Sequence, residues 1–381
     1  MTGPFGAMGI SGRVGRTDDA TVLPFGNFFA GKRALITGGM GFLGGHVARR
    51  LVALGADVTI FDIDICSERD SIVNDRRERL RPRMHLVEGD IGNASDVNKL
   101  MGEKLFDVVF HFAAFSVIEK STNAPVRTIE TNALGTAHLL EGVRNSRSEP
   151  SAIVISSTDK VYGEMEMETE RYSEQSPLRG VGIYDAAKLA GDVFAQTYHH
   201  VFGQPTVVMR LCNLFGPHDY NVGFRLFPKA LTSLFSSAEP ITPVLYFNSL
   251  NHFRDYLYID DAVRAFLLVA STPSCAGEVF NISAAHHAST PEVMRLIVEQ
   301  SAAYEALFDR DRAKKICEHG ISIVMRNGSS NVVAISRQHL DGSKLEAATG
   351  FVPEVRFVEG LQRTVEFYRS HYERARVFAS V

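Results

Sequence analysis

Tyr184 and Lys188 are the residues of this chain best suited to proton transfer. They lie four positions apart in a segment whose apolar residues recur at helical spacing, so both side chains leave one face of a helix. A phenol has an unperturbed pKa of ~10. A neighbouring ammonium and the positive charge of an oxidised nicotinamide would favour the phenolate. Tyr184 could then remove a proton from a substrate hydroxyl while hydride leaves the same carbon. Alone, such a pair is equally typical of an ordinary amphipathic helix.

Thr158, Asp159 and Lys160 come soon after an apolar run at 152–156. Ligands of open parallel sheets bind at the carboxyl ends of the strands, so the Thr158 hydroxyl could hydrogen-bond the oxygen that Tyr184 deprotonates. A carboxylic acid and an amine beside two adjacent substrate carbons can share an elimination, because one removes a proton and the other protonates the departing hydroxyl. The alternative interpretation is a surface ion pair, which contributes little energy.

A glycine-rich turn predicts a dinucleotide site. Gly38, Gly41 and Gly44 stand between a strand pattern and a helix pattern with the spacing Gly-x-x-Gly-x-x-Gly. Glycine lets the backbone touch a pyrophosphate, and a helix N-terminus offers free N–H groups to it. Asp62 ends the next strand pattern and would accept hydrogen bonds from the adenosine ribose, which favours NAD over NADP. The alternatives are a tight turn without a ligand, a capping role for Asp62, or Asp64 in its place.

The elements that must hold these residues alternate between strand and helix in the first half of the chain. Apolar runs predict strands at 33–37, 57–62, 84–88, 107–113, 152–156 and 206–211. Helical spacing predicts helices at 44–54, 94–101, 125–144 and 184–202. Strands that are apolar throughout, each followed by a helix, imply a parallel sheet covered on both faces. The expected fold class is therefore α/β, a Rossmann-type doubly wound sheet.

The pattern changes after Asn213, where prolines become frequent. We expect an NAD-binding domain at 31–213 and a smaller α/β substrate-binding cap at 214–381 that is interleaved with it. Segments near 254–283 would return to the first domain, with a strand at 279–283. Further helices are expected at 260–270, 291–303 and 359–372. Residues 1–30 are expected to form a flexible tail, from which Phe25, Phe28 and Phe29 pack locally onto the domain.

Composition narrows the class further. The 381 residues are 45% hydrophobic and have a net charge of −4 without a clustered basic face, so we expect no nucleic-acid partner. No run approaches the ~20 apolar residues of a membrane span. Four cysteines without a Cys-x-x-Cys pair favour free thiols in a reducing cytoplasm. The paired histidines at 199–200 and 286–287 lack the further ligands of a zinc site, so we expect no metal.

Taken together, these motifs resemble the extended short-chain dehydrogenase/reductase superfamily, in its nucleotide-sugar epimerase/dehydratase group. The resemblance runs from about Gly31 to near Tyr368 and includes Gly89-Asp90, His111-Phe-Ala-Ala114 and Arg254-Asp-Tyr-Leu-Tyr. The Thr-Asp-Lys run and the segment that begins at Asn213 are most similar to CDP-glucose 4,6-dehydratases.

The resemblance implies roles for single residues. Cofactor contacts with a tightly bound, recycled NAD would come from Gly38, Gly41, Phe42, Leu43, Gly44, Asp62, Asp90, Ile91, Ala113, Ala114, Asn132, Tyr184 and Lys188. Substrate contacts would come from Ser157, Asn213, Arg225 and Arg254. A guanidinium can hold phosphate oxygens in a bidentate way, which suits Arg254 to the diphosphate of a CDP-, UDP-, GDP- or dTDP-hexose. From the sequence alone, a structural salt bridge to the nearby Asp255 or Asp260 is as good an interpretation of Arg254.

The implied reaction is a 4,6-dehydration: oxidation at C4, elimination of water across C5–C6, and return of hydride to C6, giving a 4-keto-6-deoxy sugar nucleotide. One departure stands out. dTDP-glucose dehydratases have Asp-Glu after the threonine, where this chain has Asp159-Lys160. A lysine at this position resembles the CDP-glucose and UDP-N-acetylglucosamine dehydratases. A run similar to Thr158-Asp159-Lys160 and its neighbours also occurs in CDP-tyvelose 2-epimerase-like proteins. An epimerase acting at C4 or C2 therefore stays open, and so does a non-catalytic dinucleotide sensor.

The same family resemblance implies a homodimer. Helices 125–144 and 184–202 would pair with their copies into a four-helix bundle. Apolar positions such as Val193 and Phe194 are compatible with this interface, although core packing would use them equally well.

Overall fold

A seven-stranded parallel sheet is the centre of the molecule. The computed structural model describes residues 25–165, 171–284, 286–325 and 335–379. The sheet has the order β10-β6-β5-β4-β1-β2-β3, and all of its strand pairs are parallel. Its strands are β1 (Arg33–Thr37), β2 (Asp57–Asp62), β3 (His85–Glu88), β4 (Val108–His111), β5 (Ile153–Thr158), β6 (Thr206–Leu211) and β10 (Val279–Ile282). The expected Rossmann-type α/β class is confirmed.

Helices cover both faces of this sheet. They are α1 (Phe42–Ala53), α2 (Ala94–Glu103), α3 (Ile118–Asn123), α4 (Pro125–Ile129), α5 (Gly135–Asn145), α6 (Ile183–Phe202) and α8 (Ile259–Ser271). Side chains of α1 and α8 contribute to one apolar cluster, and those of α2, α5 and α6 to another. A strand with buried side chains on both faces needs such a double cover. Hence the buried centres of β1 and β4 are runs of three apolar residues, Ala34–Ile36 and Val108–Phe110.

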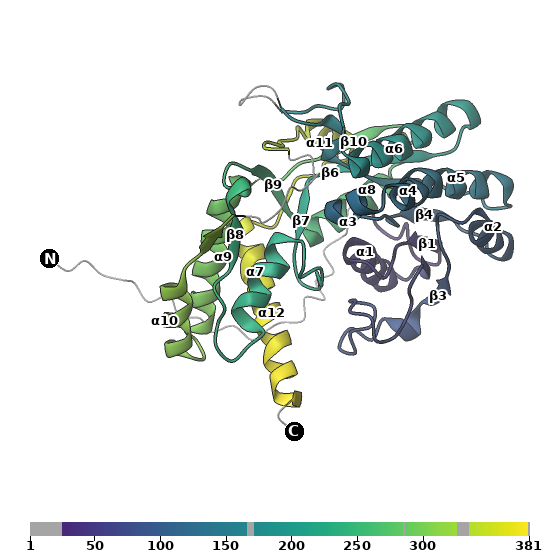
Figure 1. Cartoon of the computed structure of the whole chain (residues 1–381). Helices are drawn as coiled ribbons and strands as arrows, with labels where there is room; N and C mark the ends of the chain where they lie inside the picture. Colours follow the sequence, from purple (N-terminus) through teal and green to yellow (C-terminus); the bar gives the residue numbers. More distant parts are fainter. Residues whose placement is uncertain (1–24, 166–170, 285, 326–334, 380–381) are drawn as a thin grey trace.

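The remaining elements pack beside the carboxyl ends of the strands (Figure 1). A three-stranded sheet has the order β11-β9-β7, and β12 pairs with β8. These strands are β7 (Asn213–Phe215), β8 (Val244–Tyr246), β9 (Phe253–Tyr258), β11 (His287–Ser289) and β12 (Ser322–Val324). The helices here are α7 (Leu226–Phe235), α9 (Thr290–Glu305), α10 (Arg310–His319), α11 (Ser343–Thr349) and α12 (Phe357–Ala379).

The expected elements of the first half are all present, with their ends displaced by a few residues. Strand β10 returns to the main sheet beside β6, as the sequence predicted. The single helix expected at 125–144 is instead α4, a π-helical turn at Glu130–Leu134 and α5. Sequence reasoning missed two further groups of elements: the helices α3, α7, α10 and α11 and the short strands β7, β8, β9, β11 and β12. Segments of three to ten residues give too little periodicity.

The packed part of the chain begins earlier than expected. Residues 1–24 of the predicted tail lie outside the described residues. Phe25 and Phe29, which were expected to pack from the tail onto the domain, are buried in the core with ring centroids 5.7 Å apart. Aromatic burial of this kind offsets the entropy of ordering the chain, so 25–30 belongs to the folded body. The division into 31–213 and 214–381 stays a prediction.

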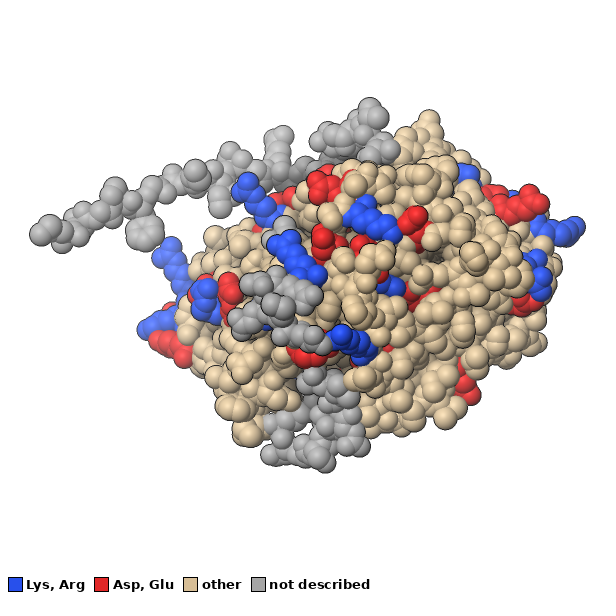
Figure 2. Space-filling view, turned by 90° about the horizontal axis from the view of Figure 1, so that it is seen from above, with Lys and Arg blue, Asp and Glu red and all other residues tan. Residues whose placement is uncertain are grey.

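The surface has charges of both signs. Figure 2 shows Lys, Arg, Asp and Glu side chains dispersed among other residues over the visible face, without one dominant patch of either sign. Within the described part of the chain, no helix has the length and apolarity needed to cross a membrane. The cytoplasmic location stays a prediction.

Candidate active site

One cavity of about 1330 Å³ opens along the carboxyl ends of the main-sheet strands. The order of the sheet reverses between β1 and β4, and ligands of doubly wound folds bind at such a switch point. The cavity wall contains every residue predicted for the site except Asn132. Residues more than 200 positions apart, such as Gly38 and Arg254, therefore line one space.

The glycine turn has the geometry of a phosphate cradle. Gly38 has a φ of 71°, and a Cβ there would lie 2.6 Å from the backbone nitrogen of Ala113. Helix α1 begins at Phe42, and its N-cap Gly41 supplies no side-chain hydrogen bond. The first N–H groups of a helix lack intrahelical partners and attract anions. Phe42, Leu43 and Gly44 line the cavity at this end, so the turn fits a dinucleotide pyrophosphate.

Asp62 lies at the end of β2 beside the glycine turn. Its Oδ2 accepts a hydrogen bond from the Met40 nitrogen at 2.9 Å, and its Oδ1 pairs with Arg69 at 2.8 Å. Arg69 also lines the cavity, whereas the competing candidate Asp64 does not. The carboxylate is thus held at the place where an adenosine ribose would bind. Sequence reasoning missed Arg69, because it lies in an irregular loop without a motif.

The adjoining wall is formed by the segments after β3 and β4. Asp90 pairs with Arg127 at 2.6 Å, and Ile91 is buried beside it. Ala113 and Ala114 line the cavity after β4. Asn132 lies behind this wall: its Oδ1 accepts a hydrogen bond from the Phe115 nitrogen at 2.7 Å. The structure therefore gives Asn132 the role of holding the 113–115 loop.

The residues predicted to transfer protons meet on one wall of the cavity. Thr158 ends β5, and its hydroxyl donates to Asp159 at 3.1 Å and also hydrogen-bonds Tyr184. Burial raises the pKa of Tyr184, and Asp159 and Asp185 raise it further. In the chain without coenzyme, Tyr184 is therefore a phenol. The expected phenolate would need the charge of a bound pyridinium.

The two lysines have different surroundings. The Lys188 ammonium donates to the Ser156 carbonyl, and burial lowers its pKa to about 8 although Asp192 opposes this. The Lys160 Nζ lies 2.9 Å from Gln338 Oε1. Burial lowers the pKa of Lys160, and Arg254 adds to this effect against Asp159. A lowered pKa leaves more of an amine in the neutral form that can accept a proton.

The pKa of Asp159 is shifted upwards, opposite to that of Lys160. Burial raises the pKa of its carboxyl, against the influence of Lys160, Arg254 and Thr158. Its Oδ2 atom has no hydrogen-bond partner among the described residues. A buried carboxyl with a raised pKa keeps its proton more easily and can act as an acid. Asp159 and Lys160 are thus shifted towards the neutral acid and the neutral base that an elimination requires.

The side chains predicted to contact the substrate differ in whether they already have hydrogen-bond partners. Ser157 lines the cavity, but its hydroxyl donates to Asp192, which forms a buried ion pair with Arg210. Asn213 also faces the cavity, and its Nδ2 has no partner in the described part of the chain. An unpaired buried amide is costly, so Asn213 is prepared for a polar ligand.

Arg225 and Arg254 supply positive charge to the same cavity. Arg225 pairs with Asp219 at 3.0 Å. Arg254 donates at 2.9 Å to the carbonyl of Ser336, and burial lowers its pKa. The salt bridge from Arg254 to Asp255 or Asp260 that the sequence left open is not among the ion pairs of the described residues.

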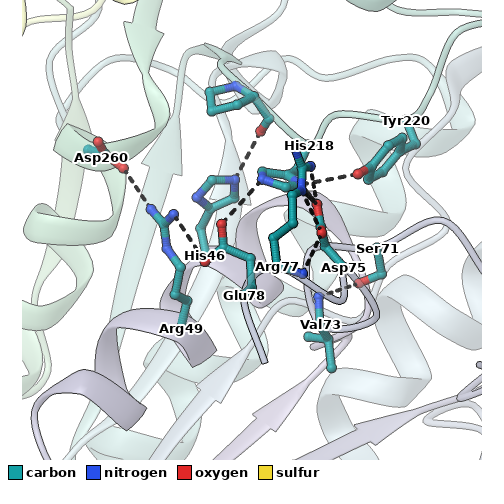
Figure 3. Close-up of polar contacts among 11 residues, drawn as sticks. His46, Arg49, Ser71, Val73, Asp75, Arg77, Glu78, His218, Tyr220 and Asp260 are labelled. Atoms are coloured by element: carbon teal, nitrogen blue, oxygen red, sulfur yellow. Dashed lines mark hydrogen bonds and ion pairs between the residues drawn. The ribbon is translucent and has the colours of Figure 1, made fainter. Parts of the chain in front are cut away.

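A further polar cluster surrounds His218, which lines the cavity (Figure 3). His218 has a φ of 63°, and its ring lies 3.7 Å from both Asp75 and Glu78. Tyr220 approaches its Nδ1 at 3.1 Å. Burial lowers the pKa of His218 to about 3, although Asp75 raises it. The cluster joins the loop after β2 to the loop after β7.

The fold and this site define an enzyme of the nucleotide-sugar dehydratase and epimerase class. The chain belongs to the family described as GDP-mannose 4,6 dehydratase, whose sequence model it matches over residues 35–364. The expected resemblance to extended short-chain dehydrogenases/reductases is confirmed.

Curated relatives and solved structures agree with this assignment. The chain is 30% identical to a dTDP-glucose 4,6-dehydratase of Xanthomonas campestris pv. campestris, over 88% of this chain and 92% of the relative. It is similar to the structure of the dTDP-glucose 4,6-dehydratase DesIV from Streptomyces venezuelae with NAD bound, at 29% identity and a TM-score of 0.72, over 90% and 98% of the two chains. A UDP-glucose 4-epimerase of Thermus thermophilus in complex with NAD has 25% identity and a TM-score of 0.73, over 88% and 99%.

Proposed function

We propose that the protein is an NAD-dependent nucleotide-diphosphate-sugar 4,6-dehydratase. The observation that supports this most is the pairing of Asp159, whose pKa is raised, with Lys160, whose pKa is lowered, beside Tyr184 in one cavity. An epimerase needs a hydroxyl oxidised and reduced again, but it has no need for a second acid and base. The family membership and the relatives named as 4,6-dehydratases point the same way.

The residues that would hold NAD fit a dinucleotide. The glycine turn leaves room for a pyrophosphate at the N-terminus of α1, and Asp62 is fixed where the ribose hydroxyls would lie. When bound, NAD supplies a hydride acceptor that later returns the same hydride. The carboxylate of Asp62 would repel a 2′-phosphate, which favours NAD over NADP.

The remaining steps belong to side chains of the chain itself. Tyr184 takes the proton of the C4 hydroxyl, and Thr158 orients that oxygen. The resulting C4 ketone makes the C5 proton acidic. The neutral amine of Lys160 removes this proton, while the carboxyl of Asp159 gives a proton to the hydroxyl that leaves C6 as water. Lys160 then returns a proton to C5, and C6 receives the hydride.

We assign the sugar nucleotide to the half of the cavity that lies away from the glycine turn. Asn213 has a free amide group, and Arg225 and Arg254 offer guanidinium groups for a diphosphate. The base and the sugar stay open among CDP-, UDP-, GDP- and dTDP-hexoses. The second candidate, an epimerase, is favoured by the similarity to the NAD complex of the Thermus thermophilus enzyme.

One assay separates the two reactions. Purified protein is incubated with CDP-, UDP-, GDP- and dTDP-hexoses in deuterated water, and the products are examined by mass spectrometry and NMR. Loss of one water with deuterium at C5 is expected. Isomerisation without loss of water would establish the epimerase instead, and absence of turnover with every hexose would leave the dinucleotide sensor.

The variant Lys160→Met tests the assigned base. Water elimination should fall by about 10²–10⁴-fold, the usual worth of a general base. NAD binding should be unchanged, because Lys160 lies outside the glycine turn. The matched control Lys99→Met removes an exposed lysine of α2 and should keep full activity. Full elimination activity in Lys160→Met would refute this role.

We further propose a homodimer through α4, α5 and α6. Val126 and Ile129 on α4 and Val193 on α6 are exposed apolar side chains, with Val126 67% exposed. Phe194, by contrast, packs against the core. Val126→Asp combined with Val193→Asp should give monomers in light scattering after gel filtration. Val358→Asp, at an exposed apolar position of α12, is the control and should stay dimeric. A monomeric wild type would refute the proposal.

A further inference from the structure

Asp255, His287 and His339 form a compact cluster outside the active-site cavity. Asp255 on β9 and His287 on β11 stand directly opposite each other in an antiparallel pair, so their side chains share one face of the small sheet. His339 lies in a stretch that forms two isolated β-bridges, from Arg337 to Phe253 and from Leu340 to Tyr172. One ligand atom from each of the three residues lies within 4.8 Å of the others.

The carboxylate at the centre is deeply buried. The Asp255 side chain is 1% exposed, and its Oδ2 accepts a hydrogen bond from the Leu340 nitrogen at 2.9 Å. Its Oδ1 faces His287 Nδ1 at 2.9 Å and His339 Nε2 at 3.8 Å. Among the ion pairs of the described residues, Asp255 meets these two histidines and neither Lys nor Arg. A buried carboxylate with so little countercharge is costly.

The two imidazole rings lie side by side next to this carboxylate. They are stacked, with centroids 4.1 Å apart, and two imidazolium rings at this separation would repel each other. The buried Nε2 of His287 has no hydrogen-bond partner within the described residues.

We propose that Asp255, His287 and His339 bind one zinc-class divalent ion. Two imidazole nitrogens and one carboxylate oxygen are a ligand set that Zn²⁺ prefers, with water in the fourth position. The hydrogen bond from Leu340 fixes the carboxylate as outer-shell groups do at metal sites. Rotation of the stacked rings would let both nitrogen lone pairs meet at the ion. The sequence could not show this site, since His287 and His339 follow Asp255 by 32 and 84 residues.

The ion would link the small sheet to the segment 335–340. That segment contains Gln338, whose Oε1 accepts the hydrogen bond from Lys160 Nζ. Backbone bonds already join it to β9, from Phe253 to Ser336 at 2.8 Å and from Gln338 to Phe253 at 3.1 Å. Zinc would therefore stabilise the chain behind the active site without touching the cavity.

A titration tests the site. Chelator-treated full-length protein is titrated with ZnCl₂ by isothermal calorimetry, and the bound zinc is counted by mass spectrometry after dialysis. One Zn²⁺ per chain is expected, together with a higher melting temperature. MgCl₂ should produce neither effect, because Mg²⁺ prefers oxygen ligands.

Variants show whether these residues hold the ion. His287→Ala and His339→Ala should each lower the zinc affinity at least about tenfold and abolish the zinc-dependent rise in melting temperature. His286→Ala is the matched control, because His286 is the next residue but stacks on Phe357 outside the cluster. It should bind zinc like the wild type.

A direct spectroscopic readout covers variants that fold poorly. Co²⁺ in a four-coordinate site absorbs visible light, and His339→Gln should weaken this band while keeping the size of the side chain. Absence of zinc binding to the wild type would refute the proposal. Equal zinc affinity in wild type, His287→Ala and His339→Ala would also refute it, because the ion would then lie elsewhere.

Discussion

The Lys160 amine is held in place by a residue far away in the sequence. Gln338, 178 positions later, accepts a hydrogen bond from its Nζ at 2.9 Å. The Gln338 side chain is 1% exposed, and its Nε2 lacks a partner among the described residues. Gln338 does not line the cavity. We therefore regard it as a positioning residue that holds the amine while burial lowers the amine's pKa.

Substitutions of Gln338 should move the pH profile in opposite directions. A base must be neutral to act, so kcat should rise with pH through the pKa of Lys160. Gln338→Glu places a carboxylate beside the amine and raises this pKa. The acidic limb of kcat should then move to higher pH, and kcat at neutral pH should fall on the order of tenfold. Gln338→Leu removes the acceptor and should move the limb to lower pH.

The profile distinguishes positioning from a general loss of structure. Gln362→Glu adds the same charge at an exposed site on α12 and should leave the limb in place. If Gln338→Glu lowered kcat equally at every pH, the contact between Gln338 and Lys160 would not govern the pKa of the amine.

Helix α6 positions Tyr184 and Lys188 through its contact with the π-helical turn at Glu130–Leu134. Gly191 lies at this contact, where a Cβ would come within 2.8 Å of the Asn132 carbonyl oxygen and 2.9 Å of Thr136 Oγ1. Single π turns in helices often accompany functional sites. Here the turn contains Asn132, which holds the cavity wall at Phe115.

Gly191→Ala should therefore destabilise the protein although alanine favours helices. The overpacking should lower the free energy of unfolding by about 1–3 kcal/mol. It should also reduce kcat, because the added methyl group displaces α6, which contains Tyr184 and Lys188. The measurement is urea unfolding together with turnover.

The same substitution elsewhere supplies the control. Gly102 lies on α2 with no atom within 4 Å of a Cβ, so Gly102→Ala should raise stability by up to about 1 kcal/mol. Equal effects of the two substitutions would show that α6 and the π turn are not closely packed.

At the scale of the whole molecule, the cluster around His218 joins parts of the chain that are far apart (Figure 3). His46 of α1 meets the Pro217 carbonyl at 3.0 Å, and Arg49 reaches Asp260 of α8 at 3.4 Å. Phe367 of α12 packs on the His218 ring, with centroids 4.2 Å apart. The main-sheet layer is thus connected to the C-terminal helix through one buried histidine.

This arrangement predicts sensitivity to acid. The pKa of His218 is about 3 in the folded chain and near 6.5 when unfolded, so its full contribution to stability is present above pH 6.5 and is lost as the pH falls towards 3. Asn also tolerates the left-handed conformation but cannot titrate. Between pH 7 and pH 5, His218→Asn should lose about 2 kcal/mol less free energy of unfolding than the wild type.

Urea unfolding at the two pH values measures this difference. His111 has a similarly lowered pKa of about 3, so some acid sensitivity should remain in the variant. His85→Asn changes a largely exposed histidine of β3 and should follow the wild type. Parallel losses in wild type and His218→Asn would show that this histidine does not govern the acid response.

The sequence by itself determined the elements and the motifs. Apolar runs and helical spacing are local properties, and each required one stretch of chain. The glycine turn was predicted together with its strand and helix from the spacing of its glycines, and the structure shows why glycine is needed at Gly38, where φ is 71° and a Cβ would meet the Ala113 backbone. Asp62, Tyr184 and Lys188 followed from their spacing to these elements, and the structure brings all of them to one cavity.

Only the tertiary structure decided which distant side chains meet. Arg69 beside Asp62, Gln338 on Lys160, and Asn132 behind the cavity wall had no local pattern. The same holds for Asp255, His287 and His339, which three separate segments bring together. Such contacts depend on how whole layers pack, and packing fixes positions through many small contacts that no short stretch of sequence contains.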